Sequence, residues 1–98
     1  MINISTARAL VEKELSKMSV NKSSKDEYVI AHVLPIDDIG WVFFYTTRAF
    51  FETQDPEYAL IGNAPFIVDK EDGSFQPTGS GGPFEEYVEE FRQKKLSR

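Results

Sequence analysis

The stretch from Gly40 to Gly73 reads GWVFFYTTRAFFETQDPEYALIGNAPFIVDKEDG and opens with the densest aromatic run of the chain. Aromatic and β-branched residues fit a pleated, half-buried surface, so residues 41–48 predict a strand. Successive side chains of a strand point to opposite faces. The two faces are then Trp41, Phe43, Tyr45 and Thr47, and Val42, Phe44, Thr46 and Arg48. Because both faces begin apolar, we expect a central strand that is covered on each side.

The second half of this stretch contains the signals of a short helix and a hairpin. Asp55 is a typical helix cap before Pro56, because proline needs no N–H at the first helical position. Gly62 is expected to end this helix in the left-handed conformation. Residues 66–69 and 75–78 predict two further strands, joined by a hairpin in which Gly73 takes the positive φ.

Two longer helices are expected near the ends of the chain. Residues 5–18 place apolar side chains at helical spacing on one stripe, with Ser5 or Asn3 as the N-cap. A second apolar stripe comes after Pro83, which suits the first position of a helix. Its charges run from acidic to basic, which complements the helix dipole, so we assign them no further role. Residues 28–36, nearly continuous in apolar residues, predict the first strand.

These elements predict one α+β domain that spans residues 1–98. Short connections favour antiparallel neighbours, so the four expected strands should form an antiparallel meander. We expect the N-terminal and C-terminal helices to pack on one face of this sheet, and the short helix to lie between strands two and three.

Composition favours a small cytoplasmic protein. The chain has 98 residues, 41% of them hydrophobic, which suffices for one core. It contains no cysteine, which excludes disulfides and thiolate chemistry and suits a reducing compartment. No run of about 20 apolar residues predicts a membrane span, and the first ten residues do not resemble a signal peptide.

The net charge of −5 is concentrated in the middle of the chain. Residues 37–73 contain eight acidic and two basic residues, whereas the flanking segments are nearly balanced. An acidic field disfavours nucleic acid and anionic lipid and attracts basic partners. The alternative interpretation is that the acidic surplus serves solubility alone.

The sequence offers little machinery for catalysis. His32 is the single histidine and falls inside an apolar strand, where a structural role is the more frequent one. No spaced ligand set predicts a metal, and adjacent aspartates such as Asp37 and Asp38 usually form a turn. The glycines of residues 79–82 precede a helix, but four glutamates come after them, which disfavours phosphate. We therefore expect no enzyme activity, no cofactor and no metal.

Two sets of residues are candidates for binding a protein partner. The acidic set lies where strands begin or end, and no structural task is evident for it; it consists of Asp37, Asp38, Glu52 and Glu57. The aromatic set is Trp41, Phe43 and Tyr45. If both long helices cover one face of the sheet, part of the other face is free for a partner. A larger core is an equally good explanation of these aromatic residues.

Several motifs in order along the chain resemble the YrhB-like family, whose domain is called the immunity protein 35 domain. They are Gly40-Trp41, Phe43-Phe44-Tyr45, Glu52-Thr53, Asp55, Leu60, Gly62-Asn63-Ala64-Pro65, Val68-Asp69-Lys70, Gly73, Thr78-Gly79 and Pro83 to Tyr87. The resemblance covers residues 41–91. One departure is Gln54, which stands where the family pattern leads us to expect glycine.

This resemblance implies a bacterial immunity protein that is not an enzyme. Such proteins are encoded beside polymorphic toxins, and each neutralises its cognate toxin by binding it. Acidic residues would speed the capture of a basic toxin, and buried aromatic residues would slow its release. The alternative hypothesis is a general client-binding or chaperone-like module without a dedicated toxin. A third, less favoured, is a small enzyme.

Overall fold

The computed structural model describes residues 1–19, 27–58, 65–78 and 83–97. These residues form an antiparallel sheet in which each strand pairs with the next, in the order β1-β2-β3-β4. The α+β class is confirmed. The elements in chain order are α1 (Ile4–Met18), β1 (Tyr28–Ile36), β2 (Gly40–Thr47), α2 (Arg48–Thr53), the 3-10 turn η1 (Pro56–Tyr58), β3 (Phe66–Asp69), β4 (Phe75–Pro77) and α3 (Phe84–Leu96).

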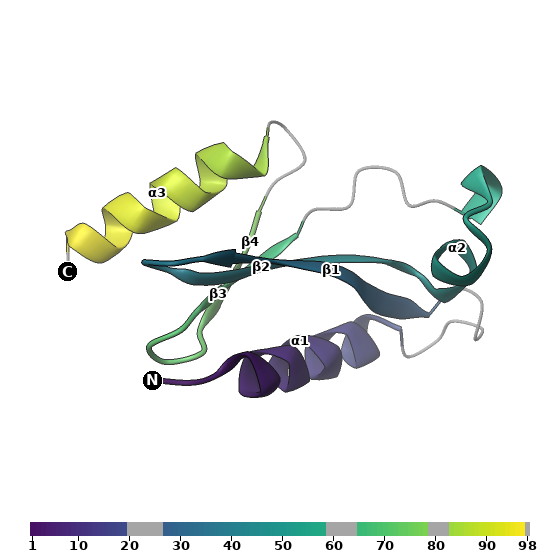
Figure 1. Ribbon diagram of the computed structural model, residues 1–98, viewed down its shortest axis with the longest axis horizontal. Helices are drawn as coiled ribbons and strands as arrows, with labels where there is room; N and C mark the ends of the chain where they lie inside the picture. Colours follow the sequence, from purple (N-terminus) through teal and green to yellow (C-terminus); the bar gives the residue numbers. More distant parts are fainter. Residues whose placement is uncertain (20–26, 59–64, 79–82, 98) are drawn as a thin grey trace.

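Helix α1 covers one face of the sheet (Figure 1). Asn3 is its N-cap and accepts a hydrogen bond from the backbone N–H of Thr6 at 2.9 Å. The buried stripe of the helix is Ala7, Val11 and Leu15. It packs on Phe43, Phe66 and Val68 of the two central strands. The aromatic face of β2 is therefore the floor of an apolar core.

Helix α3 lies on the opposite face of the sheet (Figure 1), so the expectation that both long helices share one face is wrong. Val88 and Phe91 of α3 pack with Ile39, Val42 and Ile67. The physical reason is that β2 is apolar on both sides: Val42 and Phe43 point to opposite faces, and each has no exposed surface. A sheet that is apolar on both faces needs a helix packed on each of them.

The connection between β2 and β3 contains a helix, α2, at residues 48–53, where none was expected; the helix expected from Pro56 is only a 3-10 turn in the described residues. The side chain of Thr47 accepts a hydrogen bond from the N–H of Phe50 at 3.2 Å, which caps α2 and ends β2. Gln54 then has a left-handed backbone, with φ of 60°. Asp55 caps as expected, accepting from the N–H of Glu57 at 3.0 Å. The helical segment after Asp55 is a single 3-10 turn, and Gly62 lies outside the described residues, as do residues 79–82.

The turn between β1 and β2 is anchored on the end of β3. The N–H of Lys70 donates to the carbonyl of Ile39 at 2.8 Å. Gly40, the next residue, has φ of 149°, and a Cβ there would lie 2.2 Å from the carbonyl oxygen of Val68. Only glycine permits this approach of two backbones. Gly73 has φ of 75°, as the hairpin prediction requires.

Among the described residues, β1 is an outer strand of the sheet and pairs with β2. Its register shifts between Ile30 and His32, which leaves Ala31 as a bulge. Pro35, which has no N–H, lies near the end of the strand. Bulges and prolines are typical of edge strands, because they limit uncontrolled pairing with other chains.

Candidate partner-binding surface

The four acidic candidates are divided between the two ends of β2. Asp37 and Asp38 lie in the turn before β2, whereas Glu52 and Glu57 lie in α2 and η1, after it. Eight residues of strand separate these ends by about 23 Å, at 3.3 Å per residue. The four carboxylates therefore do not form one cluster.

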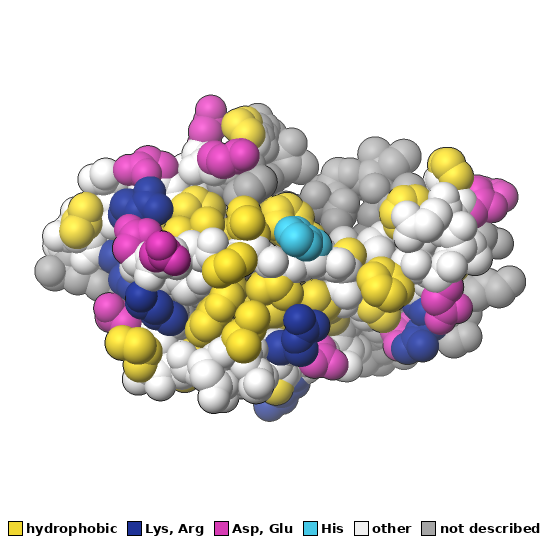
Figure 2. All heavy atoms as spheres, in the orientation of Figure 1, with side chains coloured by type: hydrophobic (Ala, Val, Ile, Leu, Met, Phe, Trp, Pro, Cys, Tyr) yellow, Lys and Arg dark blue, Asp and Glu magenta, His cyan; other side chains and the backbone are white. Residues whose placement is uncertain are grey.

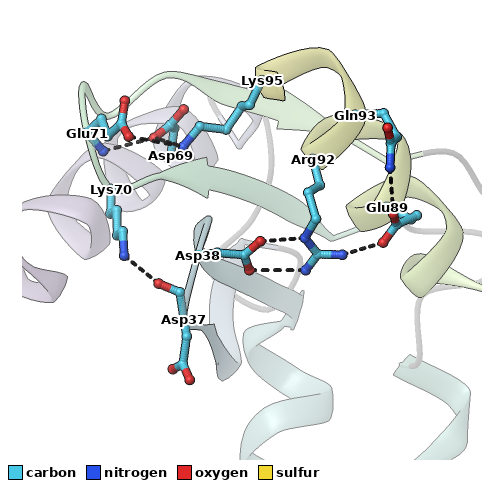
Figure 3. Close-up of polar contacts among 9 residues, drawn as sticks. All are labelled: Asp37, Asp38, Asp69, Lys70, Glu71, Glu89, Arg92, Gln93 and Lys95. Carbon is cyan, nitrogen blue, oxygen red and sulfur yellow. Dashed lines mark hydrogen bonds and ion pairs between the residues drawn. The ribbon is translucent and has the colours of Figure 1, made fainter. Parts of the chain in front are cut away.

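Asp38 has a structural partner that the sequence did not reveal. Its carboxylate accepts two hydrogen bonds from the guanidinium of Arg92 on α3, one of them at 3.1 Å (Figure 3). These bonds hold the pKa of Asp38 below its ordinary value and raise the pKa of Arg92. Arg92 also pairs with Glu89. Hydrogen bonds from Gln93 and Arg92 lower the pKa of Glu89. The Asp38–Arg92 pair joins the β1–β2 turn to the last helix.

Asp37 offers its carboxylate to solvent. Its carbonyl oxygen accepts a hydrogen bond from the Nζ of Lys70, and its side chain points away from that contact (Figure 3). Among the described residues its carboxylate makes no ion pair. Of the two aspartates in this turn, Asp37 is therefore the one available to a partner.

The acidic residues beyond β2 are also exposed. Glu52 lies 3.9 Å from the guanidinium of Arg48, a contact within one helix that contributes little at the surface. Arg48 makes its closer pair with Glu27, whose hydrogen bond raises the pKa of the arginine. Glu57 is exposed in the middle of η1. Both glutamates remain accessible at this end of the molecule.

The aromatic candidates do not form an exposed face. Phe43 has no exposed surface beneath α1, so its side chain cannot reach a partner in this conformation. Tyr45 is half-buried, with its ring 5.4 Å from that of Tyr28 and 5.5 Å from that of Phe66. Trp41 is half-buried too, and it lines a shallow pocket with Asp37. Only Trp41 is brought beside one of the acidic candidates.

A second groove runs between the end of β1 and the first turns of α3. Its floor is Leu34, Ile36 and Val88, and it is flanked by Glu85, Glu89 and Arg92. Its volume is about 350 Å³. Figure 2 shows this side of the molecule, with hydrophobic side chains across the middle, beside the cyan histidine, and acidic side chains on α3 above them.

Ile36 lines both depressions, so they adjoin at the β1–β2 turn, the groove on the α3 side of the sheet and the Trp41 pocket on the α1 side. Lys70 and Arg92 also line them. We call the two depressions together the turn surface, and its candidate binding residues are Leu34, Ile36, Asp37, Trp41, Glu85 and Glu89. Sequence reasoning missed the last two, because their position in α3 already explained them as partners of the helix dipole. The available signal was their spacing of four, which places them on one side of α3 beside Val88.

A buried ion pair holds α3 behind this surface. The Nζ of Lys95 lies 3.2 Å from Oδ1 of Asp69, which has no exposed surface, and 3.6 Å from Glu71 (Figure 3). The N–H of Glu71 donates to the same oxygen at 2.8 Å. The second oxygen of Asp69 has no hydrogen-bond partner among the described residues. The buried carboxylate of Asp69 has one positively charged partner, Lys95, so losing that partner should destabilise the fold.

The described residues show no group of three histidine or carboxylate side chains that could hold a metal ion. His32 is exposed, and its ring packs beside that of Phe44 at 5.8 Å. None of the helices in the described part of the chain has the length and apolar character to cross a membrane. The turn surface, with its apolar floor and exposed carboxylates, is suited to binding.

The chain belongs to the immunity protein 35 family, whose model matches residues 5–93. This result confirms the resemblance that the motifs suggested. A protein of Escherichia coli (strain K12), named "Uncharacterized protein YrhB", is 45% identical to this chain over 58 residues. The aligned part is 59% of this chain and 62% of that protein, so the similarity spans less than two thirds of the relative. No solved structure matches the chain.

Proposed function

We propose that this protein is an immunity protein that binds and neutralises a cognate polymorphic toxin in the bacterial cytoplasm. The observation that carries the proposal is the match of the immunity protein 35 family to residues 5–93. The family supplies the class of protein, and the exposed acidic and apolar surfaces supply a means of binding. Inhibition of this kind needs no catalysis, because a surface that covers the toxin's site is sufficient.

The turn surface is the favoured contact. It combines a half-buried tryptophan, apolar side chains and exposed carboxylates, and such a mixture suits a protein interface. Asp37 belongs to it, whereas Asp38 is engaged with Arg92. Glu52 and Glu57 lie too far away to share this contact, so their role is to attract a basic toxin at long range.

Co-expression tests the function directly. The protein is produced together with the toxin encoded beside it, and growth is compared with that of cells that carry the toxin alone or an unrelated toxin. We expect growth to be restored for the cognate toxin only, with nanomolar binding of the purified pair. Failure to restore growth, together with weak binding of many proteins, would instead support the client-binding module.

Association kinetics test the steering role. We expect the triple variant Asp37→Asn, Glu52→Gln and Glu57→Gln to bind the cognate toxin about tenfold more slowly at low salt, because it removes three exposed charges. At high salt the difference should shrink, because the Debye length falls. Stopped-flow mixing at two ionic strengths measures both rates. An unchanged rate at low salt would assign these residues to solubility.

A further inference from the structure

The groove beside β1 has a geometry suited to an added strand. We propose that the outer edge of β1 pairs with an extended, lysine- or arginine-bearing segment of the toxin, with α3 providing an acidic wall. This inference rests on the proposed function and specifies how the partner is held. Three observations carry it: the open edge, the apolar floor and the charges that flank it.

The edge is accessible along the half of β1 that faces the groove. In the described part of the chain, β1 pairs with β2 only. Ala31, His32 and Pro35 are exposed. An edge strand directs alternate N–H and C=O groups outward, and an extended peptide can satisfy them by extending the sheet. The bulge at Ala31 limits pairing before it, so residues 32–36 beyond the bulge are the part we assign. Within this part Pro35 can only accept a hydrogen bond, because it has no N–H.

The floor and wall define the chemistry of the occupant. Leu34, Ile36 and Val88 are apolar, and Glu85 and Glu89 stand beside them. Lysine and arginine side chains meet both demands, because their aliphatic stems lie on apolar surface while their charged ends reach carboxylates. Arg92 also lines the groove, but its guanidinium is paired with Asp38 and Glu89. Glu85 has no ion-pair partner in the described residues. A basic strand would supply one.

A second copy of this chain fits the edge poorly. Pairing of two β1 strands would present YVIAHVLPI to itself, and this sequence contains no lysine or arginine. The glutamates of α3 would then gain no opposite charge from the incoming strand. The acidic wall therefore favours a basic partner strand over a symmetric dimer.

A synthetic peptide isolates the binding mode from the identity of the toxin. The probe is a fluorescein-labelled, end-blocked eight-residue peptide in which lysine alternates with valine. One control peptide has glutamate in place of lysine, and another carries N-methyl groups on alternate residues, which removes one edge of hydrogen-bond donors. We expect saturable binding of the first peptide by fluorescence anisotropy and loss of binding for both controls. Backbone amide signals of residues 31–34 and 36 should shift on titration.

Matched variants locate the acidic wall. Glu85→Gln with Glu89→Gln should weaken peptide binding about tenfold, because two charge contacts of modest energy are removed. Glu12→Gln with Glu14→Gln changes the net charge equally on α1, across the sheet from the groove, and should alter binding less than about twofold. Circular dichroism melting verifies that both double variants are folded.

Several outcomes would overturn the inference. Equal weakening by the two double variants would mean non-specific attraction, and equal binding of the N-methylated peptide would mean that no strand is added. A concentration-dependent dimer in sedimentation, dissolved by the peptide, would show that a second copy occupies the edge. Growth rescue without peptide binding would support the immunity function and reject strand addition at β1. Peptide binding without growth rescue would support strand addition at β1 and reject the immunity function.

Discussion

The two faces of the sheet hold their helices by different means. On one face α1 buries Ala7, Val11 and Leu15 against aromatic residues of the sheet. On the other, α3 buries Val88 and Phe91 and adds ion pairs to Asp38 in the β1–β2 turn and to Asp69 at the end of β3 (Figures 1 and 3). Apolar packing is non-directional and strong, whereas the ion pairs depend on particular partners.

This difference bears on where a partner can bind. Most of the turn surface lies at the α3 side and around the end of β1, and its contributing side chains are half-buried or exposed. Apart from Trp41, which packs at the margin of the α1 core, residues there can be replaced without removing a side chain from that core. A protein whose partner varies can keep one face for stability and use the other for recognition.

The largest contrast should come from truncating one phenylalanine on each face. Phe43→Ala removes a fully buried ring beneath α1 and should cost about 4–5 kcal/mol of unfolding free energy. Phe91→Ala, also buried, should cost about 3 kcal/mol, because α3 ends soon after it and can shift to fill the cavity. Urea unfolding followed by circular dichroism measures both. Equal losses would mean that the two helices are held alike.

A smaller loss is expected when the buried ion pair is broken. Asp69→Asn keeps an oxygen for the N–H of Glu71 but leaves Lys95, 12% exposed, without its main partner. We expect a loss of about 2–3 kcal/mol, below the full cost of an isolated buried charge because Lys95 can still approach Glu71. Adding Lys95→Gln should recover about half of the loss. A double variant as unstable as the sum of both single variants would show that the pair has no coupling.

The sequence was sufficient for most individual elements and insufficient for their arrangement. Residues 28–36 and 66–69 were predicted with the observed bounds, because continuous apolar residues and turn signals act locally. The prediction that both helices pack on one face of the sheet was wrong. Periodicity shows that each helix has an apolar stripe, but it does not show which face of the sheet that stripe covers. Thr47 could have revealed the start of α2, but the aromatic residues after it suggested more strand.

The candidate site was less predictable for the same reason. Asp38 and Arg92 are 54 positions apart, and no local pattern links them. The acidic candidates looked like one set because they are close in sequence, whereas β2 separates them in space. Gln54 is instructive in the opposite direction: glycine was expected there from the family pattern, and the residue does adopt φ of 60°, a conformation that favours glycine.

Low pH should selectively weaken the ion pairs that hold α3 on the sheet. The pKa of Asp38 is lowered from its ordinary 3.8, chiefly by the hydrogen bond from Arg92, and that of Glu89 is lowered from 4.5. A lowered pKa in the folded state adds stability that is complete above the ordinary value and is lost as the pH falls through the folded value. The melting temperature should therefore drop on going from pH 5 to pH 3.

The variant Arg92→Gln provides the matched control. It cannot form the charged contact with Asp38, so its melting temperature should fall less over the same pH interval than that of the wild type. Other carboxylates titrate in both proteins, so only the difference between the two curves reports on this pair. Parallel curves would show that the Arg92 contacts add nothing to the stability of the folded state.

The smallest effects compare two neighbours on β1. The side chain of His32 lies on the same face of the sheet as α3, but the helix does not cover it and it is exposed. His32→Gln should therefore change the unfolding free energy by less than about 0.5 kcal/mol. Val33 faces α1 and packs at the margin of its core, so Val33→Ala should cost about 1–2 kcal/mol. Urea unfolding of the two variants side by side separates them, and growth rescue should survive His32→Gln. A loss of protection in a folded His32→Gln protein would instead place the imidazole in the contact with the toxin, since the exposed ring has no buried packing to lose.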